Sequence, residues 1–446
     1  MMQPRATMAT MRLVVVRILV LLFAAGTATP AAAQNIDDYL PAFATGANVE
    51  PGVTVLSRLR PSYDPPGVRL GSWLLTPSLT ETTGFDSNVT GYASGRGSAF
   101  ARTLGSANLM SQWSRDSLGA SVVVDDTQYL SQPDQSFTNW TVTVGGTHIL
   151  GTGEATLAYS HLELHETASD FGALQADVPV GYRVDDVRTF YAVPLGRMTL
   201  TPELDVQHYS YDNAIVLGAP VSLHDQTRDV ITAGAILRYP LTDQRSLVLV
   251  TEAIDNDYEF TSAGQPTATS HNGRVLAGLD DAARGPWHYR LLLGAEVRSF
   301  AASQYATRVA PVFEGSLVWT PNGQTTATLS LIRTIEDPAD NGAQGYVRNK
   351  AGLVLDREVR RNLLLQGSVG YQSAEPIQNG TNQTNLLFGT SLTRLVNRWA
   401  RVVLSYSFNA QRGGNVVVSA GDGAPSAVRG GNFNRQVIGL SLRLAL

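Results

Sequence analysis

The residues best suited to acid–base or metal chemistry in this sequence are its seven histidines: His148, His161, His165, His208, His224, His271 and His288. His161 and His165, with Glu163 and Glu166 beside them, have the spacing of a zinc site only if the segment is helical. On a strand, positions 161 and 165 share a face but lie about 13 Å apart, too far to bind one ion. We therefore expect no metal site at these histidines and no bound cofactor.

Motifs for catalysis are absent from the sequence. There is no cysteine, which excludes a cysteine nucleophile, disulfides and thiolate zinc sites. Neither a Gly-x-Ser-x-Gly nucleophile motif nor a Gly-x-x-x-x-Gly-Lys phosphate loop occurs. Acidic pairs could bind calcium at a rim, although such pairs are more typical of solvated loops and lumens; they are Asp125-Asp126, Asp185-Asp186, Asp280-Asp281, and Asp255 with Asp257. We do not expect an enzyme.

Composition narrows the class of protein. Of 446 residues, 43% are hydrophobic and only 16% are charged, which excludes a disordered chain. The net charge is −5, so no basic surface for nucleic acid is indicated. Lys350 is the only lysine among 33 basic residues, so the positive charge is almost entirely arginine.

An alternation of period two determines where these arginines point. Apolar residues occupy the even positions between 401 and 408 and again between 438 and 446, while Arg401 and Arg443 occupy odd positions. Successive side chains of a strand point to opposite faces, so these segments are two-faced strands. Several such segments reach about ten residues, close to the 9–11 that a tilted strand needs to cross a membrane.

Short polar turns alternate with longer polar stretches along the chain. Short turns occur near residues 115, 152, 196, 243, 285, 322, 360 and 397. The longer stretches are 86–97, 131–136, 167–180, 212–224, 262–270, 301–306, 337–345, 373–384 and 410–432. This order predicts an all-β, transmembrane antiparallel β-barrel of about 18 strands (16–20), with short periplasmic turns and long extracellular loops. A soluble β-sandwich and a β-propeller are the alternatives, but the sequence has no blade motif.

Polar side chains of such a barrel face its lumen, because a charge facing lipid at mid-membrane costs about 2–4 kcal/mol. The predicted lumen residues are Arg228, Arg238, Arg290, Glu296, Arg298, Arg308, Arg348, Arg401, Arg443, Glu203 and Asp205. The arginines could donate hydrogen bonds to hydroxyls or carboxylates of a cargo. The alternative is that they pair with acids such as Glu203, Glu296 and Asp356 and hold the wall.

The N-terminal region has the pattern of an export signal. Arg5, Arg12 and Arg17 are the only charges before residue 34. The stretch from Leu13 to Phe23 is apolar apart from Arg17, and Ala31-Ala32-Ala33 completes the pattern of a signal peptide. We expect cleavage before Gln34. The predicted organisation is a signal peptide over 1–33, a periplasmic segment over 34–69 and a barrel over 70–446, located in a bacterial outer membrane. The segment 34–69 could hang free, plug the lumen or contact a periplasmic partner.

A short stretch resembles a known family. The order of Arg58, Arg60, Pro61, Tyr63, Asp64, Pro65 and Gly67, followed by Asp86, Ser87 and Asn88, is similar to the opening of the β-barrel porin 2 family of outer-membrane proteins. Members of that family are commonly encoded beside exopolysaccharide synthesis and export genes. The resemblance therefore implies a polysaccharide exit barrel. The chain departs from most outer-membrane barrels in ending on Leu446 rather than on an aromatic residue.

Two classes of function follow. The first is a conduit, most simply for exopolysaccharide export, with a general or solute-selective diffusion porin as its alternative. The second is an outer-membrane enzyme or adhesin that uses the long loops, above all 410–432. Expected partners are outer-membrane lipid and lipopolysaccharide, a polysaccharide or small solutes, and a periplasmic polysaccharide-export protein.

Overall fold

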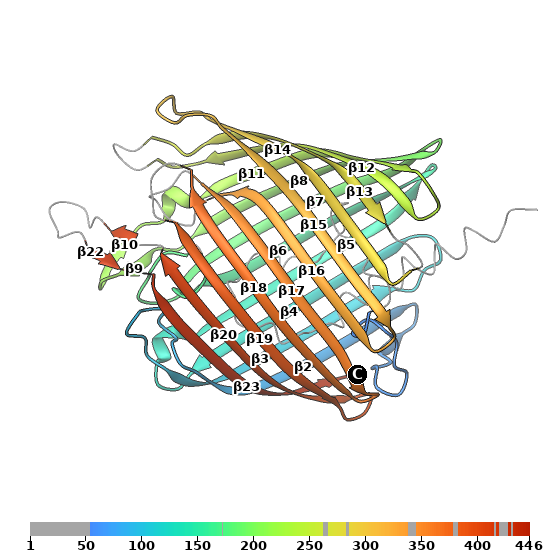
Figure 1. The fold of residues 1–446 in the computed structure, drawn as a ribbon, viewed down its shortest axis with the longest axis horizontal. Coiled ribbons are helices and arrows are strands. Elements are labelled where there is room, and N and C mark those ends of the chain that lie inside the picture. Colours follow the sequence, from blue (N-terminus) through green and yellow to red (C-terminus); the bar gives the residue numbers. More distant parts are fainter. Residues whose placement is uncertain are drawn as a thin grey trace, which may run out of the picture.

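The computed structural model describes residues 54–171, 173–261, 266–281, 285–337, 345–377, 382–413, 416–418, 427–429 and 431–446. They form a closed antiparallel barrel of 18 strands (Figure 1). Among these residues no helix is long and apolar enough to cross a membrane. The barrel strands are β2 (Trp73–Asp86), β3 (Ser98–Ser111), β4 (Ser117–Tyr129), β5 (Phe137–Leu150), β6 (Gly153–Glu166), β7 (Val180–Leu195), β8 (Met198–Tyr211), β11 (Arg228–Pro240), β12 (Arg245–Tyr258), β13 (Ser270–Asp281), β14 (Trp287–Phe300), β15 (Arg308–Asn322), β16 (Thr325–Glu336), β17 (Tyr346–Arg360), β18 (Leu363–Pro376), β19 (Gln383–Leu395), β20 (Ala400–Gly413) and β23 (Phe433–Ala445).

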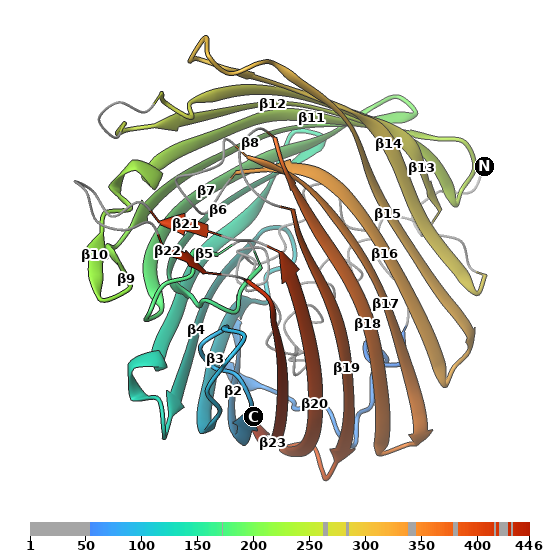
Figure 2. The ribbon, with the colours of Figure 1, turned by 60° about the vertical axis from the view of Figure 1, so that its left-hand side comes forward.

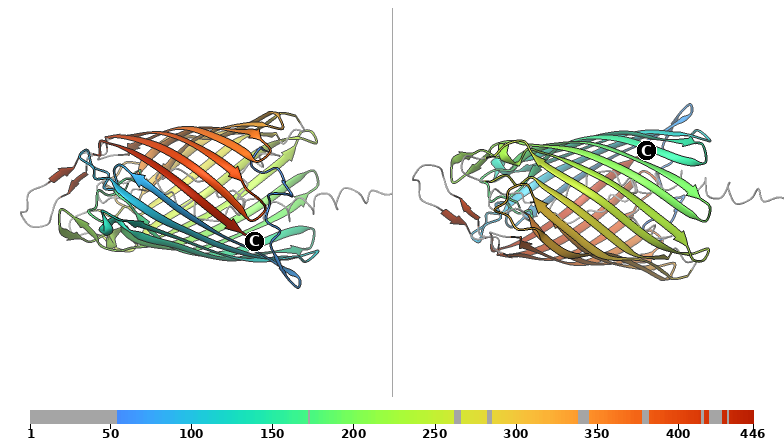
Figure 3. Two further views of the ribbon diagram at one scale, coloured as in Figure 1. Left: turned by 90° about the horizontal axis from the view of Figure 1, so that it is seen from below. Right: turned by 90° about the horizontal axis from the view of Figure 1, so that it is seen from above.

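Each barrel strand pairs with its neighbours in chain order, and β2 pairs with β23 to close the cylinder. The predicted strand number and the alternation of short turns with long loops are confirmed. The strands are longer than the sequence predicted, from 12 residues in β13 to 16 in β7. They are steeply tilted (Figure 3). Strands of this length reach beyond the hydrocarbon layer at both ends, where polar outward side chains are tolerated.

Cross-strand register separates the two faces of the wall. Directly opposite residues share a face, so the pairing of Arg401 with Arg443 puts both on the same side. Leu440, Leu442 and Leu444 of β23 alternate with them and remain about half exposed. The lipid side is therefore apolar along this strand, and the charged side is the lumen.

Aromatic side chains mark the periplasmic end of the wall. Trp287 and Trp319 lie directly opposite each other and stack at 5.4 Å between ring centroids. Trp73 and Trp113 meet edge to face at 5.3 Å, and Trp399 is exposed in the β19–β20 turn. Amphipathic indole rings are favoured at the boundary between lipid and water, so this row fits an interfacial belt.

Two prolines, Pro202 and Pro311, lie inside strands. Pro202 of β8 lies where the β7–β8 register passes from Phe190↔Glu203 to Val193↔Leu200. Pro311 pairs with β14, whereas the β15–β16 ladder begins only at Phe313. Each proline therefore lies beside a gap in one ladder, where its missing N–H donor costs little.

Short hairpins and single-turn helices lie at the two ends of the barrel. β1 (Val68–Leu70) forms a short hairpin with the start of β2 at the periplasmic end. The hairpins β9 (Ala214–Val216) with β10 (Ala219–Val221), and β21 (Val416–Val418) with β22 (Ala427–Arg429), lie at the external end (Figure 2). Two single-turn helices, η2 (Pro133–Gln135) and η3 (His224–Gln226), lie in external loops. The predicted signal peptide and its cleavage site lie outside the described residues, as do residues 414–415, 419–426 and 430 of the stretch 410–432.

Candidate functional site

Cross-strand register puts all eleven predicted lumen residues on the inward face. Arg228, Arg238, Arg290, Arg298 and Arg348 come from β11, β14 and β17. The others are Glu203 and Asp205 of β8, Glu296 of β14, Arg308 of β15, Arg401 of β20 and Arg443 of β23. Arg308 lies at the external end of its strand and is exposed. Position is thus settled by the register, while a role in binding cargo stays a prediction.

The external mouth is crossed by residues 167–179 between β6 and β7, which we call the mouth loop; residue 172 is not described. Most of its side chains are buried, which shows that the loop folds inward. Phe171 lies under the guanidinium of Arg348, 5.6 Å from its ring centroid. Arg348 belongs to β17, halfway round the barrel from β6. The mouth loop therefore reaches the opposite wall and narrows the lumen.

A buried ion pair holds the mouth loop where the barrel closes. Arg435 of β23 donates to Asp86 of β2 through Nε at 2.9 Å and Nη2 at 2.6 Å. The same guanidinium donates to the Ser169 hydroxyl of the mouth loop. Tyr129 of β4 donates to Asp86 at 3.4 Å. One arginine thus joins the first strand, the last strand and the mouth loop.

Arg228 lies within a cluster of tyrosines on the neighbouring wall. Its guanidinium carbon is 4.4 Å from the ring centroid of Tyr209 and 5.6 Å from that of Tyr258. Tyr182 and Tyr211 stack beside them at 5.3 Å. Cation–π contacts of this kind gain strength when desolvated. The result is a polar aromatic wall, with hydroxyls and a guanidinium at one level of the lumen.

Asp337, directly after β16, connects two of these arginines. It pairs with Arg298 of β14 and lies 3.9 Å from Nε of Arg228. Burial opposes its ionisation, but Arg298 and Arg228 lower the pKa of the Asp337 carboxyl below its usual value. Asp337 is therefore a fixed anion between β11 and β14 at the external mouth.

Carboxylates gather farther along the lumen. Arg274 of β13 donates to Glu252 of β12 at 2.5 Å. Glu203 of β8, Glu296 of β14 and Glu314 of β15 lie on the same inward face. Glu296 accepts from Asn272 at 3.3 Å. This part of the wall therefore carries more acidic than basic groups.

The expected partners of the lumen arginines differ in detail from the structure. Asp356, expected to pair with an arginine, accepts a hydrogen bond from Gln366 at 2.9 Å. The acids that pair with predicted arginines are Asp280, Glu336 and Asp337. Strand parity could identify the face, but not which of several inward acids lies within reach.

The periplasmic mouth holds residues 54–67, which we call the N-terminal segment. Val55 donates its N–H to the Thr326 hydroxyl at 2.9 Å and packs on Leu364 and Leu395, all inward residues. Arg58 and Arg60 both pair with Glu358 of β17. The segment is therefore fixed inside the mouth by a hydrogen bond, an apolar contact and a shared carboxylate.

Two inward arginines face each other beside this segment. Arg401 of β20 is directly opposite Arg443 of β23, where like charges repel. Asp64 of the N-terminal segment interacts electrostatically with Arg401. The periplasmic mouth thus concentrates guanidinium groups around an entrance to the lumen.

The sequence family agrees with this architecture. The profile of the family described as "Putative beta-barrel porin 2" matches residues 60–445. The chain belongs to the β-barrel porin 2 family. No curated protein matches this porin in sequence.

Several solved structures are similar to the porin in fold. OccK2 (OpdF) from Pseudomonas aeruginosa is 13% identical, with 83% of this chain and 98% of that chain covered and a TM-score of 0.45. OccAB2 from Acinetobacter baumannii is 11% identical, with coverages of 84% and 100% and a TM-score of 0.42. The FrpB iron transporter from Neisseria meningitidis (F5-1 variant) is 8% identical, with coverages of 85% and 83% and a TM-score of 0.43.

The residues that resemble the family have structural positions in this porin. Arg58, Arg60 and Asp64 lie in the N-terminal segment, and Asp64 accepts the N–H of Arg60. Gly67 adopts a φ of +73°, and a Cβ there would lie 2.8 Å from the Leu74 side chain. The porin therefore needs glycine where the chain turns into β1.

The second part of the motif joins the first and last strands at the external rim. Asp86 binds Arg435, and the Ser87 hydroxyl accepts the N–H of Gln436 at 2.8 Å. Asn88 donates to the carbonyl of Asn434 at 3.2 Å. The two parts of the motif thus act at opposite ends of the barrel.

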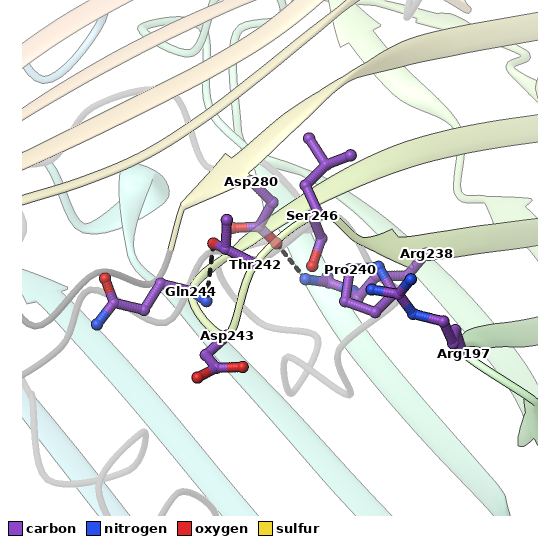
Figure 4. Close-up of a pocket in the computed structure, with 9 residues that line it drawn as sticks. Arg197, Arg238, Pro240, Thr242, Asp243, Gln244, Ser246 and Asp280 are labelled. Atoms are coloured by element: carbon purple, nitrogen blue, oxygen red, sulfur yellow. Dashed lines mark hydrogen bonds and ion pairs between the residues drawn. The ribbon is translucent and has the colours of Figure 1, made fainter.

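A cavity of about 490 Å³ lies beside the β11–β12 turn (Figure 4). Arg197, Arg238 and Asp280 contribute to its lining. Arg238 donates to Asp280 at 2.5 Å, so this predicted lumen arginine is tied to the wall. We assign the cavity a structural role at the periplasmic rim.

Sequence reasoning missed Arg435, Arg274 and Glu358. Arg435 has the same parity as Arg443, so extending the last strand from residue 438 by three residues would have found it. Arg274 follows a glycine in a segment with weak alternation. Glu358 has the parity of Arg348 and Asp356. The alternation of the sequence could have placed these residues on the inward face, but not identified their partners.

Proposed function

We propose that this porin is an outer-membrane conduit for hydroxyl-rich, acidic saccharides, and that its cargo is an exopolysaccharide in export. The observation that carries the proposal is the opposed pair Arg401 and Arg443 at the periplasmic entrance. An anionic group passing between them would relieve their repulsion, and guanidinium groups bind carboxylates in bidentate geometry. The export direction rests on the usual genetic neighbourhood of the family.

The tyrosine cluster around Arg228 supports the same cargo. Hydroxyl and guanidinium donors can bind sugar hydroxyls weakly and at many points, which conduction requires. Because acidic and basic patches alternate along the wall, no single contact would bind a passing polymer tightly. An 18-stranded barrel is wide enough for an aqueous channel when its loops allow.

A solute-selective diffusion porin is the second candidate, and the mouth loop favours it. Phe171 reaches the far wall at Arg348, which narrows the external mouth. A narrow, fixed constriction suits small acidic sugars better than a polymer. The two candidates share the same lumen chemistry and differ in cargo size and in the direction of transport.

Planar-bilayer recordings test the lumen chemistry. We expect oligomers of a uronic acid to block conductance from the periplasmic side at lower concentrations than neutral glucans of equal length. Replacing Arg401 and Arg443 by glutamine should raise the blocking concentration of the uronate about tenfold. The control Arg361→Gln, an exposed arginine in the β17–β18 turn, should leave it unchanged. Equal block by charged and neutral oligomers would contradict the proposal.

Gene deletion separates the two candidates. Export predicts that secreted polysaccharide falls while polymer accumulates in the periplasm. A diffusion porin predicts unchanged secretion and slower uptake of small acidic sugars. A periplasmic export protein bound at the N-terminal segment is an expectation of the first candidate, and co-purification with the polymer-export machinery would support it.

A further inference from the structure

Imidazole and carboxylate groups form a row on the lipid-facing side of the external end. His161, Asp185, His208, Asp229 and Asp257 occupy directly opposite positions on β6, β7, β8, β11 and β12. All have the outward parity of their strands. The row thus runs across five adjacent strands at one level, within a few residues of their external ends.

Three ligand atoms converge at the centre of this row. Nδ1 of His208 lies 2.8 Å from a carboxylate oxygen of Asp229 and 3.9 Å from one of Glu259, the residue after β12. The three side chains offer ligand atoms that all lie within 4.8 Å of one another. Their side chains are 41%, 48% and 40% exposed, so an ion can reach them.

The surroundings are strongly acidic. Asp185 lies directly opposite His208. Asp257 lies directly opposite Asp229, and these two like charges repel each other. Arg183, two positions from Asp185 on the same face of β7, lies within 3.4 Å of Glu163 and 3.7 Å of Asp212. A divalent cation would neutralise this surplus next to the lipid.

We propose that His208, Asp229 and Glu259 bind a divalent transition-metal ion such as zinc on the outer surface of the barrel. One imidazole nitrogen and two carboxylate oxygens form a zinc-type donor set, with water as the fourth ligand. An ion bound there would replace the hydrogen bond between Nδ1 of His208 and the Asp229 carboxylate. The bound ion would link β8, β11 and β12 at their external ends. Residues 212–227 separate β8 from β11 in the chain.

Two neighbouring pairs provide internal controls. His161 lies 2.8 Å from Asp185, and His271 lies 2.7 Å from Asp255, both on the same outward face. Neither pair belongs to a cluster of three ligand groups among the described residues. The proposal therefore requires metal binding at His208 and none of comparable strength at His271.

The test uses the full-length porin, purified in detergent without a polyhistidine tag and titrated with Co²⁺ as a spectroscopic probe and with Zn²⁺ by calorimetry. We expect one equivalent of Co²⁺ to give visible bands that Zn²⁺ abolishes. His208→Ala and Glu259→Gln should each weaken binding at least tenfold, whereas His271→Ala should bind like the unaltered protein. Heat-modifiable migration on a gel confirms that each variant is folded.

Three results would overturn the proposal. One is the absence of stoichiometric binding by the unaltered porin. Another is binding by folded His208→Ala with unchanged affinity. The last is an equal loss in His271→Ala, which would indicate nonspecific binding by exposed imidazoles. None of these measurements involves conductance, so they test the metal site independently of the proposed cargo.

Discussion

The two mouths of this porin are both occupied by its own chain, but they are held in different ways. At the external mouth the mouth loop is fixed by Arg435 and Asp86, whose side chains are only 7% and 1% exposed. At the periplasmic mouth Arg58, 34% exposed, and Arg60, 10% exposed, share Glu358. The first contact is sealed from water, whereas in the second the Arg58 side chain borders water and the Glu358 carboxylate, 9% exposed, is buried.

This difference separates a permanent constriction from a contact that can be displaced. Breaking a buried ion pair leaves an uncompensated charge and is strongly unfavourable. A partly exposed pair exchanges more readily with water or with another ion. We therefore interpret the mouth loop as part of the barrel and the N-terminal segment as the part that an acidic cargo or a periplasmic partner can move.

The largest effect should come from the buried pair. Arg435→Ala leaves Asp86 buried without its cation, so we expect unfolding to become easier by about 3–5 kcal/mol. Urea titrations followed by heat-modifiable gel migration measure the change. Arg308→Ala, at an exposed inward position of the same end, should change stability by less than about 0.5 kcal/mol. Equal effects of the two variants would refute the assignment.

The mouth loop itself should limit conductance. Phe171→Gly removes the ring that reaches Arg348 across the lumen, so single-channel conductance should rise about twofold. Planar-bilayer recordings at fixed salt provide the measurement, with Phe85→Ala, on the outward face of β2, as the matched control. Unchanged conductance in Phe171→Gly would show that another element sets the constriction.

At the periplasmic mouth the expected effect on stability is smaller and the effect on access is larger. Glu358→Gln removes the carboxylate shared by Arg58 and Arg60, which should cost about 1–3 kcal/mol and release the N-terminal segment. Limited trypsin digestion should then cut after Arg58 several times faster. If cleavage at the exposed Arg361 accelerates equally, the variant has loosened the whole barrel instead.

Acid should act on the external mouth through Asp337. Because the folded pKa of this carboxyl is lowered, its contribution is present above the unfolded value near 4 and is lost as pH falls through the folded pKa. We expect channel noise to increase modestly below about pH 4. Asp337→Asn should show that noise already at pH 7 and lose the pH dependence. A parallel pH response in the variant would assign the effect to another group.

The sequence predicted the wall of the barrel because the alternation of side chains is a local property. Residues 401–408 and 438–446 fix which side chains face lipid without reference to any partner, so Arg401 and Arg443 could be placed inward. The turns between strands are equally local, which is why the number of strands was correct. The family resemblance over 58–89 also located two segments that turned out to act at opposite ends.

What parity cannot supply is the distance between inward groups of different strands. From the sequence, Arg298 could pair with Glu296, with Asp337 or with the mouth loop. Which partner it contacts depends on the stagger of the strands in the closed barrel. Phe171 meets Arg348 only because β6 and β17 lie on opposite sides of an 18-stranded ring. The metal-ligand triad of His208, Asp229 and Glu259 likewise depends on the β8–β11–β12 register.

The amino-acid sequence by itself determined a two-faced, closed wall, since burial of apolar side chains in lipid demands strict alternation strand by strand. The tertiary structure alone decided that residues 167–179 enter the external mouth and that 54–67 enter the other. Those choices depend on contacts between segments hundreds of residues apart, such as Ser169 with Arg435 and Arg58 with Glu358. No local pattern in the sequence predicts such pairs, because these contacts form only when the barrel has closed.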